Sequence, residues 1–242
     1  APEQSSSVIP KANACIDPSG DSGWSPAFQP DKKCRGDHRS KSVSWQQDIE
    51  TRMSPGRMTR LLGNAVPVLK SVGWRVKEVT QGGCRSELPL CFESTNQHGM
   101  HQAALISLSA DYTGGVVLAS LFRGVPVAGV DPCTEEESVS LWLASMEVRY
   151  RSLSSDRLIA TCRVPEETVS MIQRRYQAGK RVLVNLPVTF TDPSGELIAE
   201  AQMRHFAQPS AQLKQARAAK DDRQASTESI CADDRRFEGR VR

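Results

Sequence analysis

The chain has 242 residues, which is enough for one full domain with tails or for two small domains. Its net charge of +3 is spread along the sequence, so the composition does not indicate a nucleic-acid-binding protein. Seven scattered cysteines without a CxxC pair favour a reducing compartment, and we expect a cytoplasmic protein. The longest apolar run is interrupted by Asp111 and Arg123, so no membrane span is predicted.

Composition changes along the chain predict where the folded domain lies. Residues 1–48 are rich in Ser, Pro, Asp, Lys and Gln and show no apolar period, and residues 209–242 consist mainly of Ala, Gln and charged residues. Neither segment can bury enough apolar surface to fold alone. We therefore predict one domain over residues 50–208 between two disordered tails.

The first part of this domain predicts short helices followed by a hairpin. Residues 50–72 read as one or two helices interrupted at Pro55 and Pro67. Apolar and polar residues then alternate over 74–80 and 84–92, on either side of Gly82-Gly83, as expected for two paired strands.

The middle of the domain predicts one buried helix and several strands. Apolar residues cover every side of the segment from His101 to Phe122, which indicates a helix buried on all sides. A strand is expected to open at 125–132, a long strand at 138–152, and a strand at 156–165 that returns beside the long one.

The last part predicts a surface helix and a second hairpin. Residues 166–179 are amphipathic, with two Glu at the start and Gly179 at the end. Residues 180–192 and 195–208 read as strands turned by Asp-Pro-Ser-Gly. One long apolar helix among antiparallel strands predicts an α+β fold, in which a curved antiparallel sheet wraps around the helix.

Asp111 lies in the middle of the apolar helix. Burying an isolated carboxylate costs several kcal/mol unless a partner compensates. Asp111 is therefore either a structural carboxylate, near solvent or paired with a distant Arg, or a general base held in a cleft.

The turn before this helix provides a second group of candidate residues. A helix start presents unpaired N–H groups that can hold an oxyanion. Asn96 is a neutral donor just upstream, and Gly99 permits close approach of the backbone. The helix start near Ala103 lies eight residues before Asp111, roughly 12 Å along the axis. If both groups serve one carbonyl, Asp111 must come from a second copy of the chain.

Residues 55–207 resemble the hotdog-fold acyl-CoA thioesterases of the phenylacetyl-CoA type, and more closely their uncharacterised bacterial relatives. The resemblance rests on Asn96, Gly99, Asp111 and Gly114-Gly115, which have the spacing found in that family. It implies a hotdog fold and an enzyme whose sites lie at a dimer interface, in a homodimer or a dimer of dimers.

The resemblance also implies a mechanism. Asp111 would activate a water molecule, while Asn96 and the N–H groups near Gln102 and Ala103 would stabilise the oxyanion. The substrate would be an acyl-CoA or an acyl-carrier protein, so CoA or phosphopantetheine enters only as part of the substrate, and no separate cofactor or metal is expected. Gln102 occupies the position where the family usually has His, and His101 precedes it by one residue.

Two alternatives remain. A hotdog dehydratase of 3-hydroxyacyl thioesters usually pairs a His with the acid, and His101 is the candidate for that His. A non-catalytic acyl-thioester-binding module would explain Gln102, together with Leu143 at the position where some members place a Ser. Among the remaining residues, we expect Trp74 and Trp142 to pack in the core or sheet, and His205, in the final strand, to lie on the surface.

Overall fold

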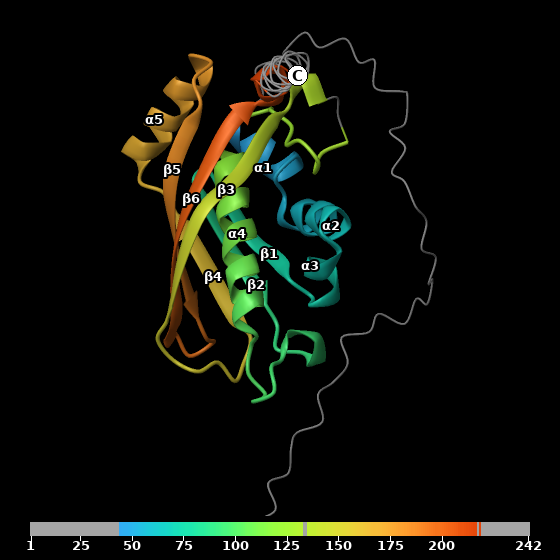
Figure 1. The fold of residues 1–242 in the computed structure, drawn as a ribbon, viewed down its shortest axis with the longest axis vertical. Helices are drawn as coiled ribbons and strands as arrows, with labels where there is room; N and C mark the ends of the chain where they lie inside the picture. The colour runs from blue at the N-terminus through green and yellow to red at the C-terminus, as the bar shows by residue number, and fades with distance from the viewer. Residues whose placement is uncertain (1–43, 133–134, 217, 219–242) are drawn as a thin grey trace, which may run out of the picture.

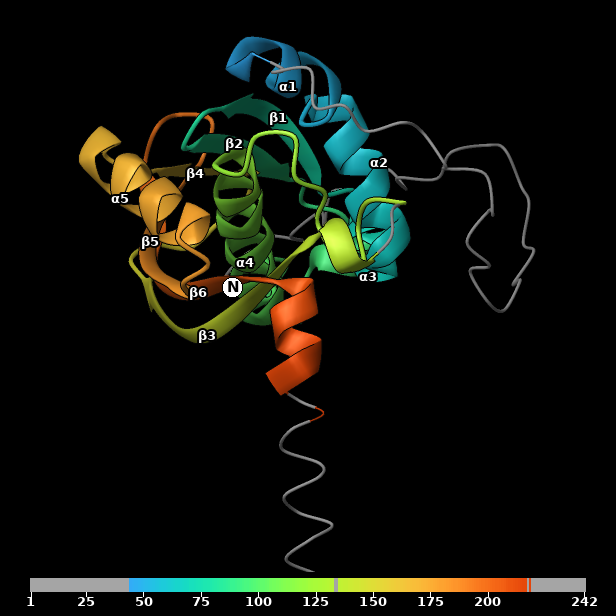
Figure 2. The same ribbon diagram turned by 90° about the horizontal axis from the view of Figure 1, so that it is seen from above.

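The computed structural model describes residues 44–132, 135–216 and 218. One curved antiparallel sheet wraps around the long helix α4 (Ala103–Ser120), as predicted (Figures 1 and 2). In the sheet the strands follow the order β1-β2-β4-β5-β6-β3. Their bounds are β1 Arg75–Thr80, β2 Gly83–Leu88, β3 Val139–Tyr150, β4 Leu158–Arg163, β5 Val182–Thr191 and β6 Leu197–Pro209.

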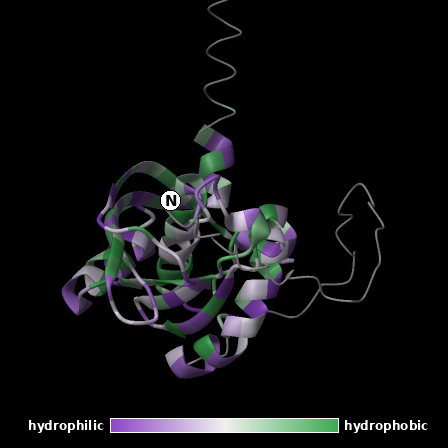
Figure 3. Cartoon of the chain, turned by 90° about the horizontal axis from the view of Figure 1, so that it is seen from below, coloured by the Kyte–Doolittle hydropathy of each residue, from purple (hydrophilic) through white to green (hydrophobic). Residues whose placement is uncertain are grey.

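Helix α4 forms the centre of the core. Its apolar residues face the sheet on one side and the N-terminal helices on the other, and Ala110, Val117 and Leu118 are completely buried. Hydropathy colouring marks many residues of the central elements as hydrophobic (Figure 3). By length and composition alone this helix could cross a membrane, and 61% of it is buried inside the domain.

Three short helices close the side of α4 that the sheet leaves open (Figure 2). They are α1 (Trp45–Thr51), α2 (Pro55–Ala65) and α3 (Pro67–Ser71). The predicted interruptions at Pro55 and Pro67 are the first residues of α2 and α3, where a missing N–H costs no hydrogen bond.

Helix α1 begins within the segment predicted as the N-terminal tail. Asp48 is only 2% exposed, and its carboxylate accepts hydrogen bonds from the Arg52 guanidinium and from the Gly124 N–H. Arg52 also donates to the carbonyls of Ala119 and Phe122 at the end of α4. These bonds attach α1 to the domain, so the predicted boundary near residue 48 falls inside a packed helix.

At the C-terminal end, residues 210–216 continue as a helix after β6. The remainder of the predicted tails, residues 1–43 and most of 217–242, lies outside the described residues.

The structure differs from two of the strand predictions. Residues 125–132 form a turn instead of a strand: Val127 makes one isolated bridge to Val139, and its N–H donates to Asp131 Oδ2 at 2.9 Å. The strand predicted beside 138–152 is β4, but β4 pairs with β2 and β5, while β3 pairs with β6. Alternation of apolar residues identifies a strand but does not specify which strand lies beside it.

The surface helix and both hairpins agree with the predictions. Helix α5 (Glu166–Gln177) buries Val169 and Ile172, and β1–β2 and β5–β6 are antiparallel pairs. Trp74 is a core residue, as predicted, and its indole N–H donates to Ser109 Oγ at 3.0 Å. Trp142 lies in β3 but is 48% exposed and is not a core residue.

Candidate active site

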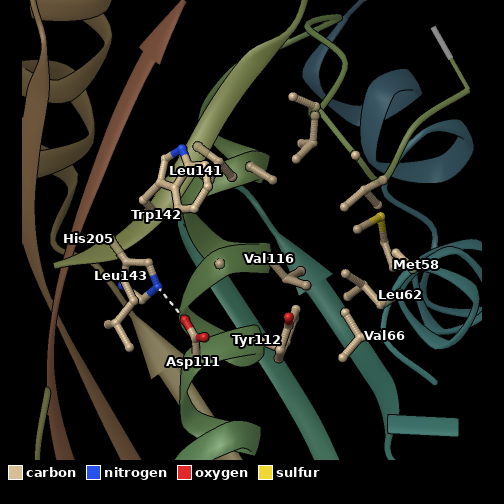
Figure 4. A pocket seen from close by; sticks show the side chains of 17 residues that line it. Met58, Leu62, Val66, Asp111, Tyr112, Val116, Leu141, Trp142, Leu143 and His205 are labelled. Carbon is tan, nitrogen blue, oxygen red and sulfur yellow. Dashed lines mark hydrogen bonds and ion pairs between the residues drawn. The ribbon is translucent and has the colours of Figure 1, made fainter. Parts of the chain in front are cut away.

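A cavity of about 420 Å³ lies beside the middle of α4 (Figure 4). Its walls come from α2, from the turn at residues 127–130, from the first half of β3, and from α4 itself, with one residue of β6. Most of these side chains are aliphatic. The ionisable groups in the wall are Asp111, Tyr112 and His205.

Asp111 projects from α4 toward His205 on β6 (Figure 4). Its Oδ1 lies 2.9 Å from His205 Nε2, and its side chain remains 30% exposed. A carboxylate acceptor requires a proton on the facing nitrogen, so His205 donates from Nε2. The partner of Asp111 is therefore a histidine and not the distant Arg considered from the sequence.

The prediction of a surface position for His205 was wrong, because the residue is only 1% exposed. Residues Ala201, Met203, His205 and Ala207 are all buried and alternate with more exposed neighbours along β6. Side chains at every second position of a strand point to the same face. This alternation with apolar residues was the sequence signal that places His205 on the inner face of the sheet.

The imidazole of His205 packs directly against Gly114. A Cβ atom at this glycine would lie 3.2 Å from His205 Cε1 and 3.4 Å from Leu186 Cδ1. The other ring nitrogen, Nδ1, is buried and has no hydrogen-bond partner among the described residues. The ring is thus fixed by packing on one side and by Asp111 on the other.

Next to Asp111, Tyr112 also faces the cavity. Burial, and to a lesser extent the negative charge of Asp111, raise the pKa of the Tyr112 phenol. The phenol therefore keeps its proton near neutral pH and is available as a hydrogen-bond donor in the cavity.

Asn96 and Gly99 shape the loop that precedes α4. The Asn96 side-chain oxygen accepts from the N–H groups of His98 at 2.8 Å and Met100 at 3.2 Å, and its nitrogen donates to the His101 carbonyl at 3.3 Å. Gly99 has φ of +75°, a conformation that favours glycine. The Asn96 amide is thus used within its own loop.

His101 is buried in the same loop, 5% exposed. Its Nδ1 lies 3.0 Å from Ser154 Oγ, and that hydroxyl donates to the Asp156 carbonyl. Burial lowers the pKa of His101. These bonds tie the loop before α4 to the segment between β3 and β4, and His101 does not reach the cavity.

The start of α4 leaves two N–H groups for a ligand. The Gln102 N–H donates to the Ser94 carbonyl at 2.9 Å, and the Gln102 side chain donates to the Thr95 carbonyl at 3.0 Å. Ala103 and Ala104 follow as the first two exposed residues of the helix. At these positions the N–H groups have no acceptor within the helix.

One copy of the chain keeps the two groups of predicted residues apart. Asp111 lines the cavity, whereas Asn96, Gly99, His101, Gln102 and Ala103 do not. Because Ala103 and Asp111 lie on one continuous helix, their separation along its axis is roughly 12 Å.

Two further observations concern Leu143 and possible metal ligands. Leu143, at the position where some family members place a Ser, pairs with His205 in the sheet and lines the cavity. Among the residues that the structure describes, no three His, Cys, Asp or Glu side chains gather as metal ligands would.

Comparison with known proteins identifies a family and a fold. The model of the family described as "Domain of unknown function (DUF4442)" matches residues 56–206. No curated protein matches the sequence.

Similar solved structures include a protein from Shewanella oneidensis that is provisionally called a thioesterase. It is 20% identical with a TM-score of 0.52, and the match covers 64% of this chain and 96% of that one. A Pseudomonas aeruginosa protein of unknown function, also provisionally called a thioesterase, is 16% identical with a TM-score of 0.51, over 62% of this chain and 93% of that one. These neighbours have the hotdog fold, and this chain shares it.

Proposed function

Because the chain belongs to the DUF4442 family and has the hotdog fold, we propose that it hydrolyses an acyl thioester of CoA or of a carrier protein. The observation that carries this proposal is the Asp111 carboxylate in the wall of a mainly aliphatic cavity. One of its oxygens accepts from His205, and the side chain remains 30% exposed. Such a carboxylate can act as a general base beside an apolar acyl group.

In the proposed reaction, Asp111 takes a proton from a water molecule while the water oxygen attacks the thioester carbon. The tetrahedral intermediate then collapses, the carbon–sulfur bond breaks, and the thiolate leaves with the proton returned from Asp111. The products are a carboxylic acid and a free thiol. His205 is a positioning residue in this scheme, because its Nε2–H holds Oδ1 and orients the carboxylate.

The oxyanion is stabilised in this proposal by a second copy of the chain. Ala103 and Ala104 at the start of α4 are exposed residues whose N–H groups have no acceptor within the helix, but they lie roughly 12 Å along the helix from Asp111 of the same copy. A homodimer would bring the helix start of one copy to the Asp111 of the other, and each dimer would then contain two sites.

Strand β3 supports such a dimer. It forms one edge of the sheet. In the second half of the strand, Met146 is 37% exposed and Tyr150 is 49% exposed, although both pair with buried residues of β6 and belong to the inner face. Edge strands with exposed apolar side chains readily pair with another chain. These features support an interface along β3 in the proposed dimer.

The geometry favours hydrolysis over dehydration. A dehydratase needs a His that faces the substrate together with the acid. In His205, Nε2 faces Asp111 and Nδ1 lies beside Gly114, and His101 is buried in the loop before α4. The Nε2 of His205 is thus engaged by Asp111 and its Nδ1 is buried, while His101 does not line the cavity.

The test is release of free thiol from a panel of acyl-CoAs that includes straight-chain and phenylacetyl thioesters. The wild-type protein should release thiol from at least one member, and Asp111→Asn should lose most of this activity. Tight binding of acyl-CoA without hydrolysis of any member would contradict the proposal and indicate a binding module. Hydration of an enoyl-CoA without thiol release would indicate a dehydratase.

A further inference from the structure

Helix α2 presents a stripe of aliphatic side chains to the cavity. Met58, Leu62 and Val66 recur at every fourth residue, from α2 to the residue after it, and therefore lie on one helical face. Figure 4 shows them opposite Tyr112 and Val116 of α4, with the cavity between the two helices. The cavity is thus a slot with aliphatic side chains on the α2 wall and with Tyr112 and Val116 on the α4 wall.

One ionisable group of the slot, Tyr112, lies closer to α2, but the other two lie on the side away from it (Figure 4). Figure 4 places Asp111 and His205 together on that side, and Met58, Leu62 and Val66 across from them. A ligand that satisfies both sides has a polar, reactive group beside Asp111 and an apolar tail toward α2. An acyl thioester has both parts: the thioester is the polar, reactive group and the acyl chain is the apolar tail.

The volume of the cavity indicates how long the tail is. A water molecule in the liquid occupies about 30 Å³, and a methylene group is of similar size, so 420 Å³ holds on the order of 14 non-hydrogen atoms. The stripe from Met58 to Val66 extends the wall over eight residues, or roughly 12 Å. A phenylacetyl group, with nine non-hydrogen atoms, would leave much of this space unfilled.

We propose that the slot between α2 and α4 binds a straight acyl chain of about 10 to 14 carbons, and that α2 sets the upper limit of chain length. This inference rests on the proposed hydrolysis of thioesters and specifies its substrate class. Leu62 and Ala65 are the residues on α2 through which the limit can be changed. Leu62 is 5% exposed and faces the cavity, whereas Ala65 lines the cavity but is itself exposed, so the slot opens to solvent beside it.

The first experiment measures binding without hydrolysis. S-alkyl-CoA thioethers with 4 to 16 carbons contain no thioester carbonyl to hydrolyse, and calorimetry gives their dissociation constants. Each added methylene should lower the dissociation constant about fourfold, the equivalent of ~0.8 kcal/mol, until the slot is full at about 10 to 14 carbons. A dissociation constant that does not change with chain length would overturn the proposal.

The second experiment lowers and raises the upper limit of chain length by substitutions on α2. Ala65→Trp adds an indole where the slot opens and should weaken binding of the 12-carbon thioether at least tenfold relative to the 4-carbon one. Leu62→Ala enlarges the slot and should shift the plateau to longer chains. The matched control is Asn64→Trp, which adds the same group at an exposed neighbouring position outside the cavity and should leave the chain-length profile unchanged.

The results separate this inference from the proposed function. Chain-length-dependent binding that responds to Ala65→Trp, without any thiol release from acyl-CoAs, would support the slot and contradict the hydrolase. Thiol release at rates independent of chain length, or equal effects of Ala65→Trp and Asn64→Trp, would contradict the slot and leave the hydrolase intact.

Discussion

The middle of α4 and its N-terminal turn contain the two groups of polar residues predicted from the sequence, but the two regions use those residues differently. At the middle, Asp111 makes its hydrogen bond to His205 and remains 30% exposed beside a cavity. At the turn, Asn96 and His101 bond to their own loop and to Ser154. The side chain carries the proposed chemistry in the first region, whereas in the second the side chains hold a backbone in place.

The largest effect that this comparison predicts is the loss of turnover when Asp111 is replaced. Asp111→Asn keeps an oxygen that can accept from His205 but removes the base, so turnover of a thioester should fall by about 10² to 10⁴. The melting temperature should hold or rise, because the variant removes a partly buried charge. Steady-state kinetics and thermal unfolding of the same preparation measure both quantities. Unfolding of the variant would instead show that Asp111 is a structural carboxylate.

At the N-terminal turn, the comparison predicts that backbone N–H groups contribute more to turnover than the side chains do. Ala103→Pro removes one N–H group while preserving the helix, because proline is favoured at the first helical position and Gln102 before it is extended, with ψ of 130°. Loss of one oxyanion donor should reduce kcat by about 10² to 10³. Ala103→Gly retains the N–H and serves as the control. Equal activity of the Pro and Gly variants would exclude this N–H from the reaction.

A pair of neighbouring glycines tests how closely His205 packs against α4. Gly114→Ala would force a Cβ against His205 and Leu186, and should destabilise the protein by about 1 to 3 kcal/mol. At Gly115 a Cβ would meet no atom within 4 Å, so Gly115→Ala should stabilise the helix by about 0.5 to 1 kcal/mol. Urea unfolding measures both free energies. Changes of the same sign would contradict the described packing of the imidazole.

The smallest predicted effect concerns the pH dependence of stability at the N-terminal turn. Burial lowers the pKa of His101 in the folded state, and the backbone of Pro89 and Leu88, with a smaller effect of the Asp156 charge, offsets this only in part. Between the folded pKa and the ordinary value of about 6.5, the unfolded chain therefore binds more protons than the folded one. The free energy of unfolding should fall as the pH drops below 6.5, by at most about 1.4 kcal/mol per pH unit from this residue. His101→Gln should show a shallower slope than the wild type between pH 6.5 and 5; identical slopes would contradict the burial of this side chain.

Local patterns in the sequence were sufficient to predict most elements that surround the site, but not the turn at residues 127–130, which was predicted as part of a strand. The apolar residues on every side of α4 predicted a central helix, and the alternation in 74–92 and 180–208 predicted the two hairpins. Asp111 was identifiable because a carboxylate on an apolar helix requires a physical explanation.

The contacts between distant segments were not predictable in the same way. His205 lies 94 residues from Asp111, and only its alternation with Met203 and Ala207 indicated an inward position. The aliphatic stripe on α2 was visible as helical periodicity, but nothing in the sequence showed that it faces α4 across a cavity. The availability of an N–H group also depends on tertiary contacts. The Gln102 N–H donates to the Ser94 carbonyl, whereas the Ala103 N–H remains available to a ligand.

The most direct test of the central claim, that one thioester is hydrolysed by Asp111 of one copy and the start of α4 of another, is complementation between two inactive variants. Asp111→Asn and Ala103→Pro proteins are unfolded and refolded together, and heterodimers carrying two different affinity tags are purified and assayed for thiol release. Each heterodimer contains one site with both an intact Asp111 and an intact Ala103 N–H, so we predict about half the wild-type activity per dimer. Heterodimers of verified composition that are no more active than either parent variant would contradict the shared site.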